Sequence, residues 1–195
     1  GLLGIVDPSG RYTTGMSGGA TDATTARAAG EAAARAALAA AGNGRGEMPA
    51  VALVTGAPAC EELVLSGIEH VLGDDVPIMG GSSADESFDG SWWAFGLSGG
   101  DAVRPTAETT CEPSNSAVVI TLFWPSVKTK LVMSSAFQPT AARGHVTRAN
   151  GRVVYEIDGE PAANVYAAWS DSADFRDKMR RVEAGGGAEG VLADT

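Results

Sequence analysis

The stretch Val76-Pro-Ile-Met-Gly-Gly-Ser-Ser-Ala-Asp-Glu86 joins a short apolar run to a series of small polar residues. The run Val76–Met79 predicts a buried strand, and Gly80–Asp85 predicts the loop that follows it. Glycine lets backbone N–H groups approach a bound group closely, and serine hydroxyls add donors and acceptors. The same residues also suit an ordinary tight turn. The stretch therefore predicts either a ligand-binding loop or a structural turn.

The residues before this stretch complete a strand–helix–strand unit. Residues 50–54 are continuously apolar, which is typical of a buried strand, and Gly56-Ala-Pro58 turns the chain. A helix is expected over about residues 61–72. Glu61 and Glu62 fall in its first turn, where the backbone dipole favours negative charge, so we interpret them as helix-start residues rather than catalytic carboxylates. Because α/β proteins usually bind ligands at the carboxyl ends of strands, Gly80–Asp85 becomes the candidate site.

The remaining patterns predict a mixed α/β (α+β) fold, with largely antiparallel sheet layers and packed helices. An Ala-rich helix is expected from Thr21 or Asp22 to Ala41. Further strands are expected at residues 1–7, 117–124 and 130–137. A hairpin of residues 145–148 and 152–157 should turn at Asn150-Gly151, and helices should follow Pro161 over residues 162–169 and 171–183.

Composition excludes several classes of function. The formal net charge is −10 and the isoelectric point is near 4.6, whereas a nucleic-acid-binding face needs clustered Lys and Arg. No DNA or RNA partner is expected. The sequence contains no apolar run of about 18 residues, so no membrane span is expected. Cys60 and Cys111 lack metal-site spacing, and the sequence leaves open whether they pair.

Four motifs occur together in a fixed order: Val76–Asp85, then Gln138-Pro-Thr140, Val146-Thr-Arg148 and Glu156-Ile-Asp-Gly-Glu-Pro-Ala162. This set resembles the FIST family (F-box and intracellular signal transduction), whose members are sensory input modules. The resemblance implies a FIST N-terminal-type domain over residues 1–165, with its first segment missing. Residues 166–195 would form a helical connection and the start of the family's C-terminal part.

The resemblance implies a non-enzymatic, cytoplasmic domain that binds a small molecule, such as an amino acid, and passes the bound state to a signalling output protein or domain. No metal or cofactor is expected, and a homo-oligomer is left open. The loop would supply N–H and hydroxyl contacts, a tryptophan an apolar wall, and an arginine a carboxylate clamp. The predicted ligand-binding residues are Gly80, Gly81, Ser82, Ser83, Asp85, Trp93, Arg143 and Arg148.

Two alternatives remain at this point. Some FIST-type proteins resemble haem-based gas sensors, and His70 and His145 are the two histidines that could ligate iron. A Ser-dependent hydrolase could be assembled from Ser82 or Ser83 with His145 and Asp158, although the Gly-x-Ser-x-Gly signature is absent. Neither histidine has a supporting motif, so we expect a colourless, non-enzymatic protein.

Overall fold

The computed structural model describes residues 4–42, 46–84, 91–97, 114–134, 137–170 and 177. The chain divides into two compact units, Gly1–Val132 and Met133–Thr195, and each is described by itself. The domain boundary expected near residue 165 falls inside a helix of the second unit, α3 (Ala162–Trp169). The assignment of residues 1–165 and 166–195 to two family domains stays a prediction.

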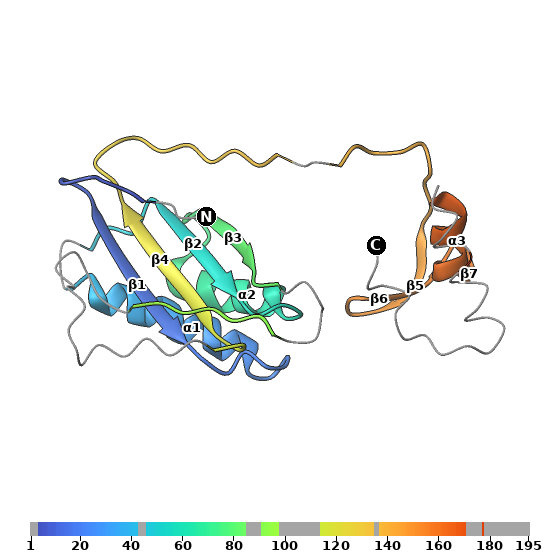
Figure 1. Cartoon of the computed structure of the whole chain (residues 1–195), viewed down its shortest axis with the longest axis horizontal. Coiled ribbons are helices and arrows are strands. Elements are labelled where there is room, and N and C mark those ends of the chain that lie inside the picture. The colour runs from blue at the N-terminus through green and yellow to red at the C-terminus, as the bar shows by residue number, and fades with distance from the viewer. Residues whose placement is uncertain are drawn as a thin grey trace. The chain divides into compact units, whose positions relative to one another are not determined.

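The first unit is built on a four-stranded mixed sheet in the order β1-β4-β2-β3 (Figure 1). Its strands are β1 (Arg11–Ser17), β2 (Val51–Gly56), β3 (Ile78–Ser82) and β4 (Val118–Trp124). β2 and β3 are parallel, and β4 runs antiparallel to both β1 and β2. Three strands therefore point the same way, and their carboxyl ends lie at one edge of the sheet. The predicted mixed α/β class is confirmed.

Two helices, α1 (Ala26–Ala40) and α2 (Glu61–Leu72), cover one face of this sheet (Figure 1). Right-handed crossovers that step in the same direction along a sheet place both helices on the same side. The helices approach closely because a glycine of each helix faces the backbone of the other helix. A Cβ on Gly30 would overlap the backbone of Val64, and one on Gly67 would overlap the backbone of Arg27.

The core lies between the sheet and these helices. Every second residue of β4 faces it, and Val118, Ile120 and Leu122 are fully buried. The Ala-rich face of α1 packs against them, because small side chains let the helix lie close to the sheet. The one buried polar side chain among the described residues, Thr13, donates its hydroxyl to the carbonyl of Ala37 at 2.8 Å. This bond ties β1 to α1.

The opposite face of the sheet is lined by pairs across β1 and β4. Tyr12 meets Phe123 edge to face, with ring centroids 5.4 Å apart, and the Thr14 and Thr121 hydroxyls are 2.9 Å apart. Residues 91–97 run across this face (Figure 1). Gly96 lies directly over β4 and β1, since a Cβ there would press against Val119 and Thr14.

Three predictions of strands are wrong: one strand ends later than predicted, and two predicted strands are not formed by their described residues. β3 continues to Ser82, so Gly80, Gly81 and Ser82 belong to a strand rather than to a loop. Described residues 4–7 form no strand, and neither do the described parts of the segment 130–137. Both segments are apolar enough for a strand, but no neighbouring strand in the described structure supplies hydrogen bonds to them. The helix predicted over residues 171–183 lies outside the described residues, except for residue 177.

The second unit contains a three-stranded antiparallel sheet in the order β5-β6-β7, followed by α3. Its strands are β5 (Val146–Asn150), β6 (Val153–Ile157) and β7 (Glu160–Pro161). The predicted hairpin is confirmed, and Gly151 adopts the positive φ of 56° that such a turn requires. Among the described residues of this unit only Ala167 is buried.

Candidate functional site

The candidate site lies where β2 and β3 end and α2 begins. After Gly56 the chain turns through residues 57–60 to reach the helix, and Ala59 takes a φ of +85°, which is uncommon for a residue other than glycine. The N–H of Ser83 donates to the carbonyl of Gly56 at 2.8 Å, which holds the ends of the two strands together. The predicted motif thus sits at the carboxyl edge of parallel strands, as the topology of ligand-binding α/β proteins favours.

The two glycines of the motif differ in what they do. Gly80 has a φ of +147°, and a Cβ there would overlap the carbonyl group of Val54 on the neighbouring strand. It is therefore needed for strand pairing. Gly81 has no atom within 4 Å of the position that a Cβ would take, so its surroundings are open. The predicted accessibility of the backbone fits Gly81, whereas Gly80 has a structural role.

The hydroxyl of Ser82 donates to the Glu61 carboxylate with a distance of 2.6 Å. Glu61 lies in the first turn of α2, as predicted, but its contact with the motif was not foreseen. The order strand, helix, strand already indicates this contact, because the start of the helix and the end of the following strand lie at the same end of the sheet. The pair presents a negative charge and a hydroxyl on an exposed surface.

The free thiol of Cys60 lies beside this pair. It is the residue before α2, is half-buried, and packs against the core. Asp85, the last predicted member of the motif, lies outside the described residues. The strand end formed by Gly81, Ser82, Ser83 and Glu61 is called the serine edge below; Gly81 and Ser82 are exposed there, whereas Ser83 and Glu61 are half-buried.

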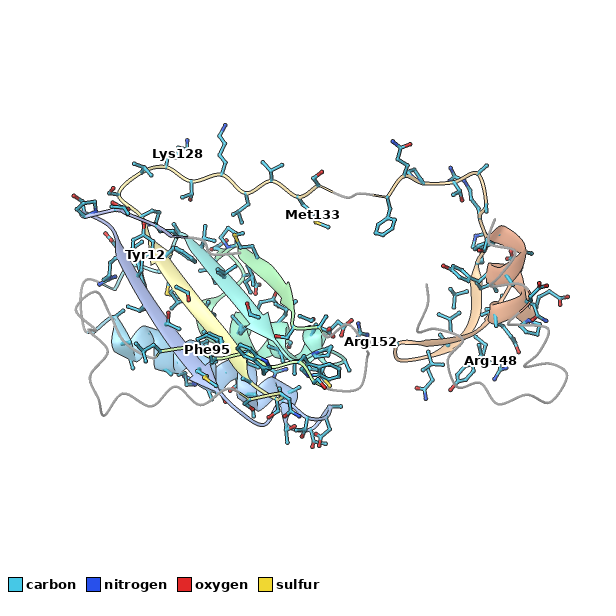
Figure 2. The ribbon with its side chains drawn as sticks, in the orientation of Figure 1. Tyr12, Phe95, Lys128, Met133, Arg148 and Arg152 are labelled. Atoms are coloured by element: carbon cyan, nitrogen blue, oxygen red, sulfur yellow. The ribbon has the colours of Figure 1, made fainter. Side chains whose placement is uncertain are left out.

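The two tryptophans of the segment 91–97 differ in exposure, because neighbouring residues of an extended chain point to opposite sides. Trp92 is half-buried, and its indole N–H donates to the carbonyl of Asn115 at 2.9 Å. Trp93 is 58% exposed and stacks on Phe95, with ring centroids 5.3 Å apart. Phe95 is labelled in Figure 2. Trp93 thus belongs to an exposed aromatic pair on the first unit rather than to its core.

The two predicted arginines belong to the second unit. Arg143 is exposed, and Arg148 forms an ion pair of 2.8 Å with Glu156 while its guanidinium lies 4.8 Å from the ring centre of Tyr155. Arg148 is labelled in Figure 2. Its Nε is therefore already engaged by a carboxylate of its own unit. A ligand carboxylate would have to use the remaining guanidinium nitrogens or displace Glu156.

The histidines named for the alternative functions lie in different units. His70 is in the last turn of α2 and is exposed. His145 is 95% exposed, and its Nδ1 lies 3.6 Å from the Asp158 carboxylate. Ser82 and Ser83 belong to the first unit, whereas His145 and Asp158 belong to the second. Within the described ranges, no cluster of three or more His, Cys, Asp or Glu side chains has the arrangement of a metal site.

Comparison with known proteins identifies the class of the chain. The model of the FIST N domain matches residues 2–160, and the chain belongs to this family. The resemblance drawn from the ordered motifs is thereby confirmed. FIST domains are sensory domains of signal-transduction proteins. The match covers all of the first unit but its first residue, together with the hairpin of the second.

A curated relative is an uncharacterized protein of Methanocaldococcus jannaschii. It is 33% identical over 102 residues, which is 51% of this chain and 17% of the relative. The chain thus matches about a sixth of that relative's length. No helix in the described ranges combines the length and apolarity that crossing a membrane requires.

Proposed function

We propose that this chain is a cytoplasmic input domain that binds a small molecule carrying an ammonium group, such as an amino acid, at the serine edge. The observation that carries the proposal is the contact of 2.6 Å between the Ser82 hydroxyl and the Glu61 carboxylate. It supports a ligand-binding role because a carboxylate and hydroxyls gather where the strands end and the open surroundings of Gly81 leave room.

Each group has a distinct part in the proposed recognition. The Glu61 carboxylate accepts hydrogen bonds from the ligand ammonium, and charge assistance makes these bonds stronger than neutral ones. The Ser82 hydroxyl, which now donates to Glu61, keeps lone pairs with which to accept from the ligand. Ser83 adds a second hydroxyl. The bound state is then passed to a signalling output protein or domain, and no chemical step is needed.

The test is a thermal-shift and calorimetric screen of the full chain against amino acids and their uncharged analogues. A ligand that binds only the folded state at about 100 times its Kd stabilises that state by about 2.7 kcal/mol and raises Tm. We expect the double variant Ser82→Ala, Ser83→Ala to weaken binding by about 1–3 kcal/mol, because neutral hydrogen bonds are lost.

Two variants sharpen this test. Glu61→Gln keeps an acceptor but removes the charge, so it should weaken an ammonium ligand more than an uncharged analogue. Ser66→Ala is the matched control. Ser66 lies on α2, away from the serine edge, and its hydroxyl accepts a hydrogen bond from Arg27. If a ligand binds the wild type, the double serine variant and Glu61→Gln with the same affinity, its binding site lies elsewhere on the protein.

The remaining alternatives are tested separately. We propose that the domain works without haem and is not an enzyme. We expect no histidine-dependent Soret band when the purified protein is reconstituted with haem. His70→Ala and His145→Ala should therefore leave its spectrum unchanged. Esterase and amidase assays should show no turnover that depends on Ser82 or Ser83. A histidine-dependent Soret band would favour the gas-sensor function instead.

A further inference from the structure

The sheet of the first unit ends at β3, and no strand of the described structure pairs with its outer side. The inner side pairs with β2, as in the bond from the Ser83 N–H to the Gly56 carbonyl. Because backbone groups of a paired strand point alternately to its two sides, Ile78, Gly80 and Ser82 direct their N–H and C=O groups away from β2. These groups form the template for a further strand.

β3 lacks the features that usually protect an edge strand. Natural edges carry charges, prolines or bulges that prevent pairing with another chain. The register of β3 with β2 is unbroken, no charged residue lies between Ile78 and Ser82, and all its residues after Ile78 are exposed. In the part of the chain that the structure describes, the edge is therefore open in both its backbone and its side chains.

A suitable added strand occurs in the same chain. The segment Lys128–Ser134 is exposed and has no regular structure, although the sequence predicts a strand over residues 130–137. Val132 is 88% exposed and Met133 is 97% exposed. Figure 2 labels Lys128 and Met133 on this segment. Apolar residues of high strand propensity thus stay without the partner strand that their backbone requires.

Charge favours the same pairing. Lys128 and Lys130 are two of the three lysines in a chain of net charge −10. Asp74 and Asp75 precede β3, and Glu61 contacts Ser82 at its other end. Carboxylates therefore lie at both ends of the open edge. The lysines of an added strand meet one of them whether it runs parallel or antiparallel to β3.

We propose that the segment Lys128–Ser134 of one molecule adds as a strand to β3 of a second copy. Two copies can exchange their segments reciprocally, because each carries both the open edge and the strand that fits it. The result is a homodimer in which each four-stranded sheet becomes five-stranded. The association does not need the ligand proposed above, but a lysine that meets Glu61 would share this carboxylate with the ligand ammonium.

The experiment compares the full chain with two variants at Val132 by light scattering over a wide range of protein concentrations. Val132→Pro removes a backbone donor and should raise the dimer Kd by about tenfold or more. Val132→Thr keeps the N–H and the β-branched shape, so its Kd should change by less than about threefold. Because Val132 is exposed, both variants should fold.

Amide hydrogen exchange then locates the contact. The outward amides of Gly80 and Ser82 should exchange more slowly as protein concentration rises, and they should lose this protection in Val132→Pro. The inward amides of Met79 and Gly81 should be protected at every concentration. A chain that stays monomeric, or a dimer indifferent to Val132→Pro, overturns the proposal. Protection of Gly80 that is independent of concentration also overturns it, because the segment then pairs within one molecule.

Discussion

Neighbouring glycines in one motif show how far identical residues can differ. A Cβ on Gly80 would overlap β2, whereas Gly81 faces open space. We expect Gly80→Ala to lower the free energy of unfolding by about 2 kcal/mol or more, because both the positive φ and the close approach of the strands oppose a side chain. Gly81→Ala should change it by less than about 0.5 kcal/mol. Urea unfolding measures both.

The same pair separates stability from binding. Gly81→Ala adds a methyl group to the serine edge without straining the strand. Any loss of ligand affinity in this variant would therefore come from the changed binding surface rather than from a loss of stability. Equal destabilisation by the two variants would contradict the distinction drawn between the glycines.

Asp7 is a second case in which a residue's role comes from its contacts. Its carboxylate accepts hydrogen bonds from the Ser126 hydroxyl at 2.5 Å, the Ser126 N–H at 2.8 Å, the Tyr12 hydroxyl at 2.7 Å and the Gly10 N–H at 3.0 Å. These bonds, those from Ser126 foremost, hold the pKa of Asp7 well below its ordinary value of 3.8. The carboxylate thereby ties the turn before β1 to the chain that follows β4.

A lowered pKa fixes the direction of the pH effect. The stabilisation from Asp7 is fully present above its unfolded pKa and is lost as pH falls through the lower folded pKa. We expect Tm of the wild type to decline below about pH 4, and the decline to be shallower in Asp7→Asn, which has no charge to lose. Melting curves from about pH 2 to 6 test this. Parallel curves for the two proteins would show that Asp7 is not responsible.

At the scale of elements, the contact between α1 and α2 depends on glycine. Ala is the better helix former by about 1 kcal/mol, so propensity alone predicts that Gly30→Ala stabilises the protein. We expect the opposite, a loss of about 2 kcal/mol or more, because the new methyl group would overlap the backbone of Val64. Chemical denaturation gives the sign directly.

The reverse exchange at an exposed position of the same helix is the control. Ala32→Gly should cost about 1 kcal/mol, as propensity predicts, because Ala32 lies on the solvent side of α1. A stabilising Gly30→Ala would mean that the helices do not approach as closely as described.

The segment 130–137 shows the limit of reading elements from local pattern. Its apolar, β-prone residues predict a strand as well as those of β4 do, yet its described residues, 130–134 and 137, form no strand. A strand exists only when a neighbour accepts its hydrogen bonds, and the neighbour is a property of the tertiary structure. β3 shows the converse, because pairing with β2 extends it through two glycines that local pattern assigns to a loop.

At the scale of the whole molecule, the two units differ in how much they bury. The hydrophobic core cluster belongs to the first unit, whereas Ala167 is the one buried residue described in the second. A three-stranded sheet with so little buried surface is marginal by itself. We expect a fragment of residues 1–132 to unfold cooperatively, and a fragment of residues 133–195 to show no cooperative transition. Calorimetry of both fragments checks this.

The sequence by itself determined the family, the acidic charge, the strand–helix–strand unit and the hairpin at Asn150-Gly151, because ordered motifs, periodicity and turn residues act over short distances. It also placed Gly80–Ser83 at a strand end. Only the tertiary structure decided that β4 lies between β1 and β2 and that Ser82 contacts Glu61. It also decided that Gly80 lies against the backbone of β2, whereas Gly81 faces open space. Those features depend on atoms brought together from distant parts of the chain, and no local pattern specifies which distant neighbour a residue will have.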